Sequence, residues 1–442
     1  MATPLDPHAA IVTHAAGQGA AAEARPNAQG VLLTTADGQP LARALTRSRR
    51  RARRQAFLLV LPLLAFVLIT FVVPIGQMLQ RSAKNPGFSD NMPQVSAWFD
   101  ENPRGAVPDE AAFAALAADM AAAAEARTVG IVGTRINYEL PGTRSLFTST
   151  GRKVARGIEP PHREALLEMD PRWADEELWT AMRNASTPYT SSFYLAALDR
   201  TRDSAGDVAR VPENRQVYVM LFQRTLWLSL LITGLTFVLG FPVAHLLATL
   251  PMRRSNLLMI LVLLPFWTSL LVRTTAWIVL LQQQGVVNDA LVWLGLIGEQ
   301  GRLQMIYNQT GTIIAMTHIL LPFMILPLYS VMRTINPSYV RAARSLGATS
   351  WTAFRRIYFP QTLPGLGAGA LLVFILAVGY YITPALVGGS SGQLISNMIA
   401  MHMTETLNWS MAAALAALLL AGVLILYWLY DRLVGIDNLK LG

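Results

Sequence analysis

Hydrophobic runs long enough to cross a membrane alternate with polar segments along most of this chain. A helix needs about 20 mainly apolar residues to span roughly 30 Å of hydrocarbon. Six runs meet this requirement, at 56–78, 218–250, 256–281, 311–332, 363–381 and 411–430. The pattern predicts an all-α polytopic membrane protein with six transmembrane helices.

The charges between these runs alternate in the way that sets membrane orientation. Basic residues cluster before the first run, in the turn at 251–255 and at 333–356, whereas 384–408 contains no Lys or Arg. Cytoplasmic loops carry the excess of basic residues, so both termini are expected in the cytoplasm. The cluster before the first run is Arg43, Arg47, Arg49, Arg50, Arg51, Arg53 and Arg54. A nucleic-acid patch is the alternative for this cluster, but the span that follows at once favours an orientation signal.

A segment of different composition separates the first run from the other five. Residues 83–215 are mixed in charge, with a helical candidate from Asp109 to Ala126 and apolar anchors at Trp173, Trp179 and Tyr194. Orientation places this insertion outside, and its length suffices for a small folded cap. The predicted parts are a disordered basic cytoplasmic tail (1–55), transmembrane helix 1 (56–82), an external insertion (83–215), a five-helix core (216–434) and a cytoplasmic tail (435–442).

Composition supports a membrane protein and excludes several chemistries. The 442 residues are 53% hydrophobic and 14% charged, against about a quarter charged in soluble domains. The absence of cysteine excludes disulfides, thiolate metal sites and iron–sulfur clusters. Neither a phosphate-binding loop of the G-x-x-x-x-G-K-[ST] type nor an H-E-x-x-H metal helix occurs. We therefore expect no metal or cofactor, no enzymatic activity and no ATP hydrolysis by P-loop chemistry.

The polar stretch before the fifth run predicts two short helices. Asn336 can cap the first, and Gly347 can end it in a left-handed conformation. Thr349 or Ser350 can cap the second, which Pro360 is expected to stop. The local signals thus predict a compact helical loop with a glycine at its centre.

The second of these helices has an apolar face beside a basic flank. Its apolar residues at helical spacing are Trp351, Phe354, Ile357 and Tyr358, whereas Arg355 and Arg356 point elsewhere. This shape suits docking into a groove on another protein. The alternative is a solvated loop that merely joins two spans.

The order Ala342-Ala343, Leu346-Gly347-Ala348, Phe354, Ile357, Pro360 and Pro364-Gly365 resembles the EAA loop of ABC-importer permeases. The resemblance implies that residues 336–363, the coupling loop, dock into a cleft of an ATPase subunit. The residues expected to couple are Arg341, Ala342, Ala343, Gly347, Ala348, Phe354, Ile357 and Pro360. Phe354 and Ile357 are expected to fill the cleft, and Ala343, Gly347 and Ala348 to form a close-packed pivot. Arg341 departs from the family, which has Glu there.

Polar and aromatic residues inside spans are candidates for a translocation path. The candidates are Trp267, Thr268, Arg273, Trp277, Tyr380, Tyr381, Thr383 and Pro384. For Arg273, snorkelling of the side chain to the membrane interface is an equal alternative to a role in the path. For Tyr380 and Tyr381, the alternative is a place in the belt of aromatic residues at the interface. Pro265 allows the third span to bend. A hydrogen-bonded packing role is favoured for His245 and His318, and Asn397, His402 and Glu405 are candidate mouth or surface residues.

The runs Leu264–Trp277 and Tyr380–Gly389 resemble the polyamine (spermidine/putrescine) branch of these permeases, specifically its first permease subunit. The resemblance covers about 217–434. It implies a multi-pass permease of a bacterial inner (plasma) membrane, working with a second related permease, an ABC ATPase dimer and a periplasmic solute-binding protein. Import of an opine, a phosphonate or another small cation remains open. The rival classes are an ATP-independent secondary transporter and a membrane-anchored receptor whose working part is 83–215.

Overall fold

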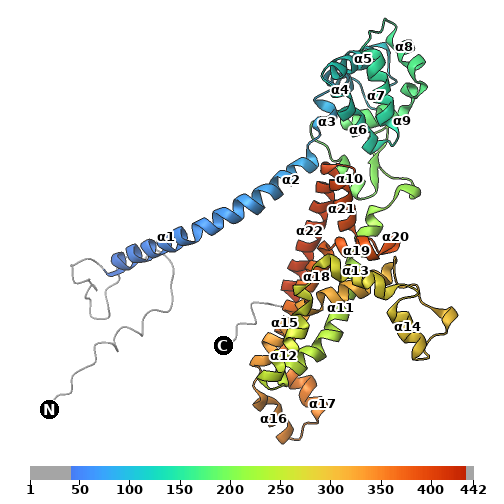
Figure 1. Ribbon diagram of the computed structural model, residues 1–442. Coiled ribbons are helices and arrows are strands. Elements are labelled where there is room, and N and C mark those ends of the chain that lie inside the picture. The colour runs from blue at the N-terminus through green and yellow to red at the C-terminus, as the bar shows by residue number, and fades with distance from the viewer. Residues whose placement is uncertain (1–40, 435–442) are drawn as a thin grey trace. The chain divides into compact units, whose positions relative to one another are not determined.

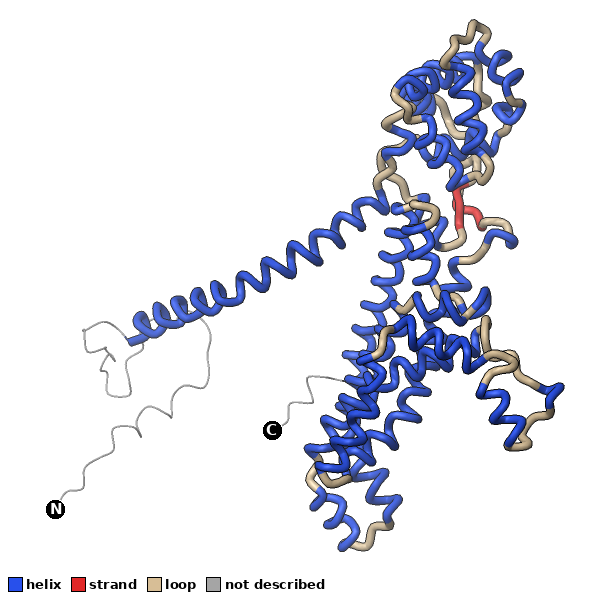
Figure 2. Tube along the Cα trace, viewed as in Figure 1, coloured by secondary structure: helices blue, strands red, loops and turns tan. Residues whose placement is uncertain are grey.

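The computed structural model describes residues 41–434, most of which are helical (Figures 1 and 2). The chain divides into two compact units, Met1–Gly76 and Gln77–Gly442. The tails predicted for 1–40 and 435–442 lie outside the described residues.

Residues 41–55, expected to be disordered, are helical. Helix α1 covers Leu41–Val67, a π-helical turn covers Leu68–Val72, and α2 covers Val73–Ala83. The prediction of disorder is wrong for this part because Ala, Leu and Arg are strong helix formers that extend the helix of the hydrophobic run. The first candidate span accordingly runs over Leu45–Ala83.

Two π-helical turns each stand just before a proline. Leu68–Val72 is followed after one residue by Pro74, and Phe354–Tyr358 is followed after one residue by Pro360. Proline lacks an N–H and clashes with the carbonyl four residues earlier, and a wider turn relieves both effects. The expectation that Pro360 stops a helix is therefore wrong, because one helical span runs through it over Ser350–Gly379.

The insertion is a helical domain with a core of its own. Its elements are α3 (Pro86–Ser89), α4 (Pro93–Glu101), α5 (Glu110–Glu125), α6 (Val129–Glu139), α7 (Thr143–Val154), α8 (His162–Met169), η2 (Pro171–Ala174), α9 (Glu176–Ala185), α10 (Ser192–Ala197), β1 (Arg200–Arg202), β2 (Val208–Arg210) and η3 (Glu213–Arg215). The predicted Asp109–Ala126 helix is confirmed as α5, whose first turn is capped by the Asp109 carboxylate. Trp173 and Trp179 are buried in the core, as expected.

The prediction of an all-α chain misses one small element. Strands β1 and β2 form an antiparallel pair with Arg200 opposite Arg210 and Arg202 opposite Val208 (Figure 2). The turn between them carries Gly206 at φ +97°, a conformation that L side chains rarely adopt. Alternation over only three residues per strand is too short a signal to predict from sequence.

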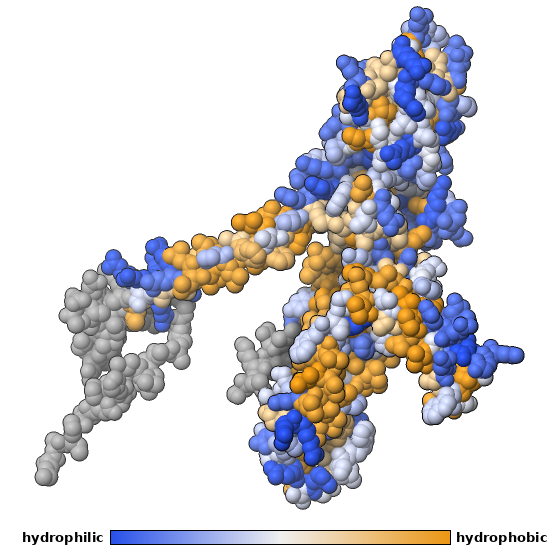
Figure 3. Space-filling view, viewed as in Figure 1, coloured by the Kyte–Doolittle hydropathy of each residue, from blue (hydrophilic) through white to orange (hydrophobic). Residues whose placement is uncertain are grey.

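The membrane core follows from Tyr218. Its elements are α11 (Tyr218–Thr249), α12 (Met252–Leu263), η4 (Leu264–Trp267), α13 (Leu270–Leu281), α14 (Val286–Trp293), η5 (Glu299–Gly301), α15 (Gln309–Thr334), α16 (Pro337–Ser345), α17 (Ser350–Ala353), η6 (Phe354–Tyr358), α18 (Phe359–Gly379), α19 (Ile382–Val387), α20 (Gly389–Gly392), α21 (Ile395–Thr404) and α22 (Trp409–Val434). Apolar side chains cover much of its outer surface (Figure 3).

The described residues contain five helices long and apolar enough to span a membrane, and a sixth if one bent pair counts as a span. The bent pair is Met252–Trp267 with Leu270–Trp293, which turn by 97°. Pro265 lies at the start of the short 3-10 turn at this bend. The bend anticipated at Pro265 is therefore confirmed, and it divides the predicted 256–281 helix.

Helices α15 and α18 pack closely through glycine. A Cβ on Gly369 would lie 2.9 Å from Met324 Sδ, and a Cβ on Gly365 would lie 2.8 Å from the Pro327 carbonyl oxygen. Small residues allow membrane helices to approach in this way. Since α18 continues from the coupling loop, this contact connects the loop to the centre of the core.

Candidate functional site

The first half of the coupling loop folds as its capping residues predict. The Asn336 side chain accepts a hydrogen bond from the backbone N–H of Ser338 at 3.0 Å, at the start of α16. Gly347 has φ +91°, and the N–H of Ala348 donates to the Ala343 carbonyl at 3.0 Å. This bond and the left-handed glycine form a Schellman-type helix end.

Gly347 is not the close-packed pivot that was expected. It is exposed, and no atom lies within 4 Å of the position that its Cβ would occupy. Glycine is therefore required by the backbone conformation rather than by a neighbour. The close approach of helices lies further along, at Gly365 and Gly369.

Phe354 packs against its own chain. Its ring stacks on Trp351 and Tyr358, with centroids 5.7 and 5.9 Å away, and meets the edge of Phe241 in α11 at 6.0 Å. Phe354 and Ile357 are half-buried. This placement does not suit the expected role of Phe354 as the group that fills a partner's cleft.

Other apolar side chains of the loop are exposed to solvent instead. Leu346 is 89% exposed, Trp351 is 67% exposed and Tyr339 is 54% exposed. Of the remaining predicted coupling residues, Arg341, Ala342 and Pro360 are exposed and Ala343 and Ala348 are half-buried. We call Tyr339, Leu346 and Trp351 the apolar tip of the loop.

The far end of the loop is joined to α11. The Tyr358 hydroxyl lies 3.0 Å from His245 Nδ1, within hydrogen-bonding distance. The packing role predicted for His245 is thereby confirmed.

A polar cluster forms where α13, α15 and α19 meet. Trp277 Nε1–H donates to His318 Nδ1 at 3.1 Å, and the hydroxyls of Thr274 and Thr383 lie 3.3 Å apart. Thr274 and Thr383 are buried. The structure thus pairs Trp277 of the predicted path with His318, and Thr383 of the predicted path with Thr274, which lies one helical turn before Trp277.

Arg273 belongs to the same region. Its Nη2 donates to the Thr268 carbonyl at 3.3 Å, across the bend of the third span. Its Nε is buried and makes no hydrogen bond to any described residue.

The predicted Tyr380–Pro384 segment marks the break between α18 and α19. Ser396 Oγ–H donates to the Tyr380 carbonyl at 2.6 Å, and Asn397 Nδ2–H donates to the Tyr381 carbonyl at 2.8 Å. Pro384 is buried. Trp267 is 81% exposed and lies outside the cluster, as does the exposed Tyr381 ring.

The inserted domain is attached to the membrane core by an unexpected residue. The Asp199 carboxylate accepts hydrogen bonds from the backbone N–H groups of Val217, Tyr218 and Val219 at 2.8–3.1 Å, at the start of α11. Asp199 has φ +54° and is 7% exposed. No local signal could have identified it, because the amides that it caps lie 18 to 20 residues later.

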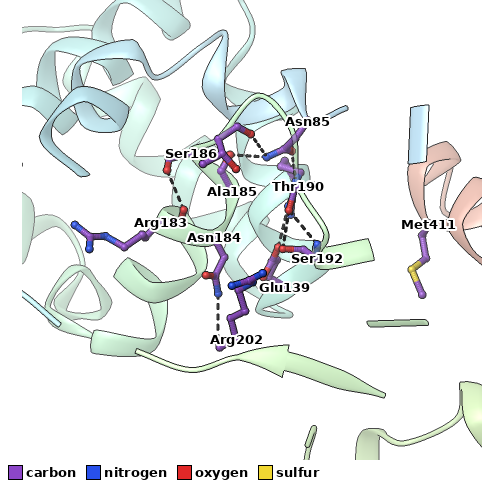
Figure 4. A network of polar contacts seen from close by, with 12 residues as sticks. Asn85, Glu139, Arg183, Asn184, Ala185, Ser186, Thr190, Ser192, Arg202 and Met411 are labelled. Carbon is purple, nitrogen blue, oxygen red and sulfur yellow. Dashed lines mark hydrogen bonds and ion pairs between the residues drawn. The ribbon is translucent and has the colours of Figure 1, made fainter. Parts of the chain in front are cut away.

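Polar contacts also join the two places where the chain enters and leaves the helical part of the domain. Asn85 Nδ2–H donates to the Ala185 carbonyl, and the N–H of Thr190 donates to the Ala83 carbonyl at 2.8 Å. Asn184 donates to the Arg202 carbonyl at 3.2 Å, which ties α9 to β1 (Figure 4). The domain is therefore joined to the rest of the chain by two segments that are hydrogen-bonded to each other, rather than by a single linker.

A cavity of about 1080 Å³ lies between this domain and the core. Tyr218 and His402 line it and are joined by a hydrogen-bond contact of 2.9 Å, and Glu405 also lines it. The other charged residues along its wall are Arg135, Glu139, Arg144, Glu176, Glu177, Asp199, Arg200, Arg202, Asp203 and Arg215. Both signs are represented, so the lining does not select a cation or an anion by charge alone.

Comparison with known proteins places this chain among transport proteins. Residues 222–435 match the family model of the binding-protein-dependent transport system inner membrane component. The spermidine/putrescine transport system permease protein PotB of Escherichia coli is 35% identical over 222 residues, which cover 50% of this chain and 80% of that protein. PotB of Haemophilus influenzae is 31% identical over 253 residues, or 56% and 88% of the two chains.

Among solved structures, a bacterial ABC transporter that imports alginate matches with a TM-score of 0.41 at 20% identity, covering 51% of this chain and 80% of that one. The alignments with these sequence relatives cover most of the relatives' own length at more than 30% identity, and the relatives are named as permease proteins. The chain is therefore a non-catalytic, multi-pass inner-membrane component, and it belongs to the binding-protein-dependent permeases of ABC importers, in the branch that includes the spermidine/putrescine permeases.

Proposed function

We propose that this chain is the first permease subunit of an ATP-driven importer whose cargo is a polyamine such as spermidine or putrescine. The observation that carries the proposal is its identity of 31–35% to permeases named for these solutes, over 77–88% of their length. The partners in this proposal are a second related permease, two ATPase subunits and a periplasmic solute-binding protein.

The proposed orientation puts both termini and the coupling loop in the cytoplasm and residues 83–215 in the periplasm. Exposed arginines in the coupling loop and the lack of Lys and Arg in 384–408 support it. In this proposal the first helix ends at Ala83, the external domain extends from there to Arg215, and the permease core begins at Tyr218.

In the proposed mechanism, ATP-driven closure of the ATPase subunits moves the coupling loop. The second half of the loop is continuous with α18 through the π-helical turn, so a displacement of Trp351 passes along a single helix. Gly365 and Gly369 then transmit it to α15 by direct contact. Rocking of these helices exchanges access from outside to inside.

The proposed path passes the cluster of Trp277, His318 and Thr383. Residues 218–434 contain four acidic residues, namely Asp289, Glu299, Glu405 and Asp431. Glu299 and Glu405 lie outside the candidate spans, and Asp431 lies at the end of the last one. Asp289 lies in the second half of the bent pair, where it is ion-paired with Arg302 at 2.7 Å. A polyamine inside the path would therefore meet aromatic faces and carbonyl oxygens rather than carboxylates.

Transport in proteoliposomes tests the proposal. The chain is reconstituted with the other subunits encoded beside its gene, and uptake of radiolabelled spermidine and putrescine is measured with and without ATP. We expect saturable uptake that requires ATP and the binding protein. Uptake without the ATPase would instead indicate a secondary transporter, and competition by an opine or a phosphonate would reassign the cargo.

A further inference from the structure

The charged residues of the coupling loop are all positive. Residues 336–363 contain four arginines, Arg341, Arg344, Arg355 and Arg356, and no acidic residue, Lys or His. All four arginines are exposed. None of their guanidinium groups forms a hydrogen bond or an ion pair with any residue between 41 and 434. The loop thus presents a net charge of +4 that no residue between 41 and 434 neutralises.

The same loop presents the apolar tip. Leu346 follows the last turn of α16, and Trp351 lies in the first turn of α17, so these two residues of the tip stand between the two pairs of arginines in the sequence. Helices α16 and α17 lie together at one end of the core, beyond α12 and α15 (Figure 1). An open side chain such as Leu346, at 89% exposed, gains stability when a partner covers it.

Apolar and basic features at one site define the partner that fits. Burying Leu346 and Trp351 requires an apolar groove. The four guanidiniums near them in the sequence pair with none of the described residues and require carboxylates, which bind guanidinium in a planar, bidentate way. A basic or neutral rim would leave these charges desolvated and unpaired, which is costly.

We propose that the coupling loop docks into an apolar groove with an acidic rim on the ATPase subunit, and that the arginines set the choice of that subunit. The inference rests on the proposed coupling function and adds the electrostatic character of the partner. Arg341 and Arg344, three residues apart on α16, form one contact with the rim, and Arg355 and Arg356 form the other.

The first test measures binding of the purified ATPase subunit to the full chain in nanodiscs of neutral phosphatidylcholine. The variant Arg341→Glu/Arg344→Glu should weaken binding about tenfold or more and reduce its salt dependence. The matched control is Arg253→Glu/Arg254→Glu, which reverses two exposed arginines in the first turn of α12. The control should retain at least half of the affinity.

A second test identifies the rim directly. No lysine occurs between 218 and 434, so Arg341→Lys introduces a single amine there and keeps the charge. A zero-length carbodiimide should then join Lys at this position to an Asp or Glu of the ATPase, as located by mass spectrometry. Arg253→Lys should give no such product.

The outcomes separate this inference from the coupling function itself. If Leu346→Ala abolishes binding but Arg341→Glu/Arg344→Glu leaves it unchanged, docking of the loop holds and the acidic rim is refuted. If the control reversal weakens binding as much as the loop reversal, general surface attraction replaces a specific rim. If wild-type binding occurs only in anionic lipid, headgroups are the partner of the arginines. If no ATPase binds under any condition, the proposed function itself fails.

Discussion

The carboxylate of Asp199, at the foot of the inserted domain, accepts a hydrogen bond from the backbone N–H of Tyr218, the first residue of α11, at 3.1 Å. The same carboxylate also binds the amides on either side of this one. Asp199 holds a left-handed backbone conformation while doing so. A residue of the insertion thus caps the first helix of the permease core. A movement of either part would therefore strain or break these hydrogen bonds.

Replacing Asp199 by Ala should destabilise the protein. Three helix-start amides lose their acceptor, and loss of such a cap costs about 1–2 kcal/mol. Asp199→Asn should cost less, because Asn tolerates φ > 0 and keeps one acceptor oxygen. Thermal unfolding in detergent measures the difference.

The matched control for this cap is Asp175→Ala. Asp175 stands before α9 but makes no side-chain cap bond there, so its loss should change stability by about 0.5 kcal/mol or less. Equal effects of the two Ala variants would contradict a specific role for the Asp199 cap.

Substitution of Gly347 should separate folding from coupling. Gly347→Val forces a β-branched residue into a left-handed conformation, at a cost of about 1–2 kcal/mol or more, although nothing crowds its side chain. We expect normal membrane insertion and loss of ATP-driven uptake, whereas Gly347→Asn should retain most uptake.

Gly295 provides the comparison for Gly347. It also has a positive φ, +69°, and open space around its Cβ, but it lies outside the coupling loop. Gly295→Val should therefore leave uptake intact. Normal uptake by Gly347→Val would argue against a rigid loop as the coupling device.

Enlarging Gly369 should act through packing instead. A Cβ there approaches Met324 Sδ to 2.9 Å and its backbone oxygen to 3.2 Å. Overpacking of this kind typically costs about 1–3 kcal/mol. Gly369→Val should lower the melting temperature and the uptake rate together. Gly422→Val, in α22 with open space around it, should change neither; unaltered stability in Gly369→Val would show that α15 and α18 are not in close contact.

The inserted domain should show a pH dependence that comes from Asp119. Its carboxylate is buried and accepts a hydrogen bond from the N–H of Val95 at 2.9 Å, and burial raises its pKa from 3.8 to about 6. The folded state therefore holds this proton to higher pH than the unfolded state. The contribution of Asp119 to the free energy of unfolding falls as pH rises from about 4 to about 6.

The variant Asp119→Asn isolates this contribution. It removes the titration and keeps an oxygen for Val95, so its stability relative to the wild type should rise by up to about 2 kcal/mol between pH 4 and pH 7. Melting temperatures of both proteins across this pH range provide the measurement. A constant difference across the range would mean that the pKa of Asp119 is not raised.

Short-range features of the fold could be predicted from the sequence. The caps at Asn336 and Asp109 and the left-handed Gly347 depend on atoms a few residues away, and the structure has each of them. The cytoplasmic placement of the loop stays a prediction. The stop at Pro360 was wrong because a π-helical turn accommodates the proline, which capping rules do not anticipate.

The sequence by itself determined the hydrophobic spans, the bend at Pro265 and the position of the coupling loop, because run length, proline and capping are local properties of the chain. Tertiary structure decided which side chains are available for function. Phe354 is covered by Phe241 and Tyr358, Trp277 meets His318 41 residues later, and Thr274 meets Thr383 109 residues later. Helical periodicity gives the face on which a side chain lies, but only the packing of distant helices determines whether that face is buried or free.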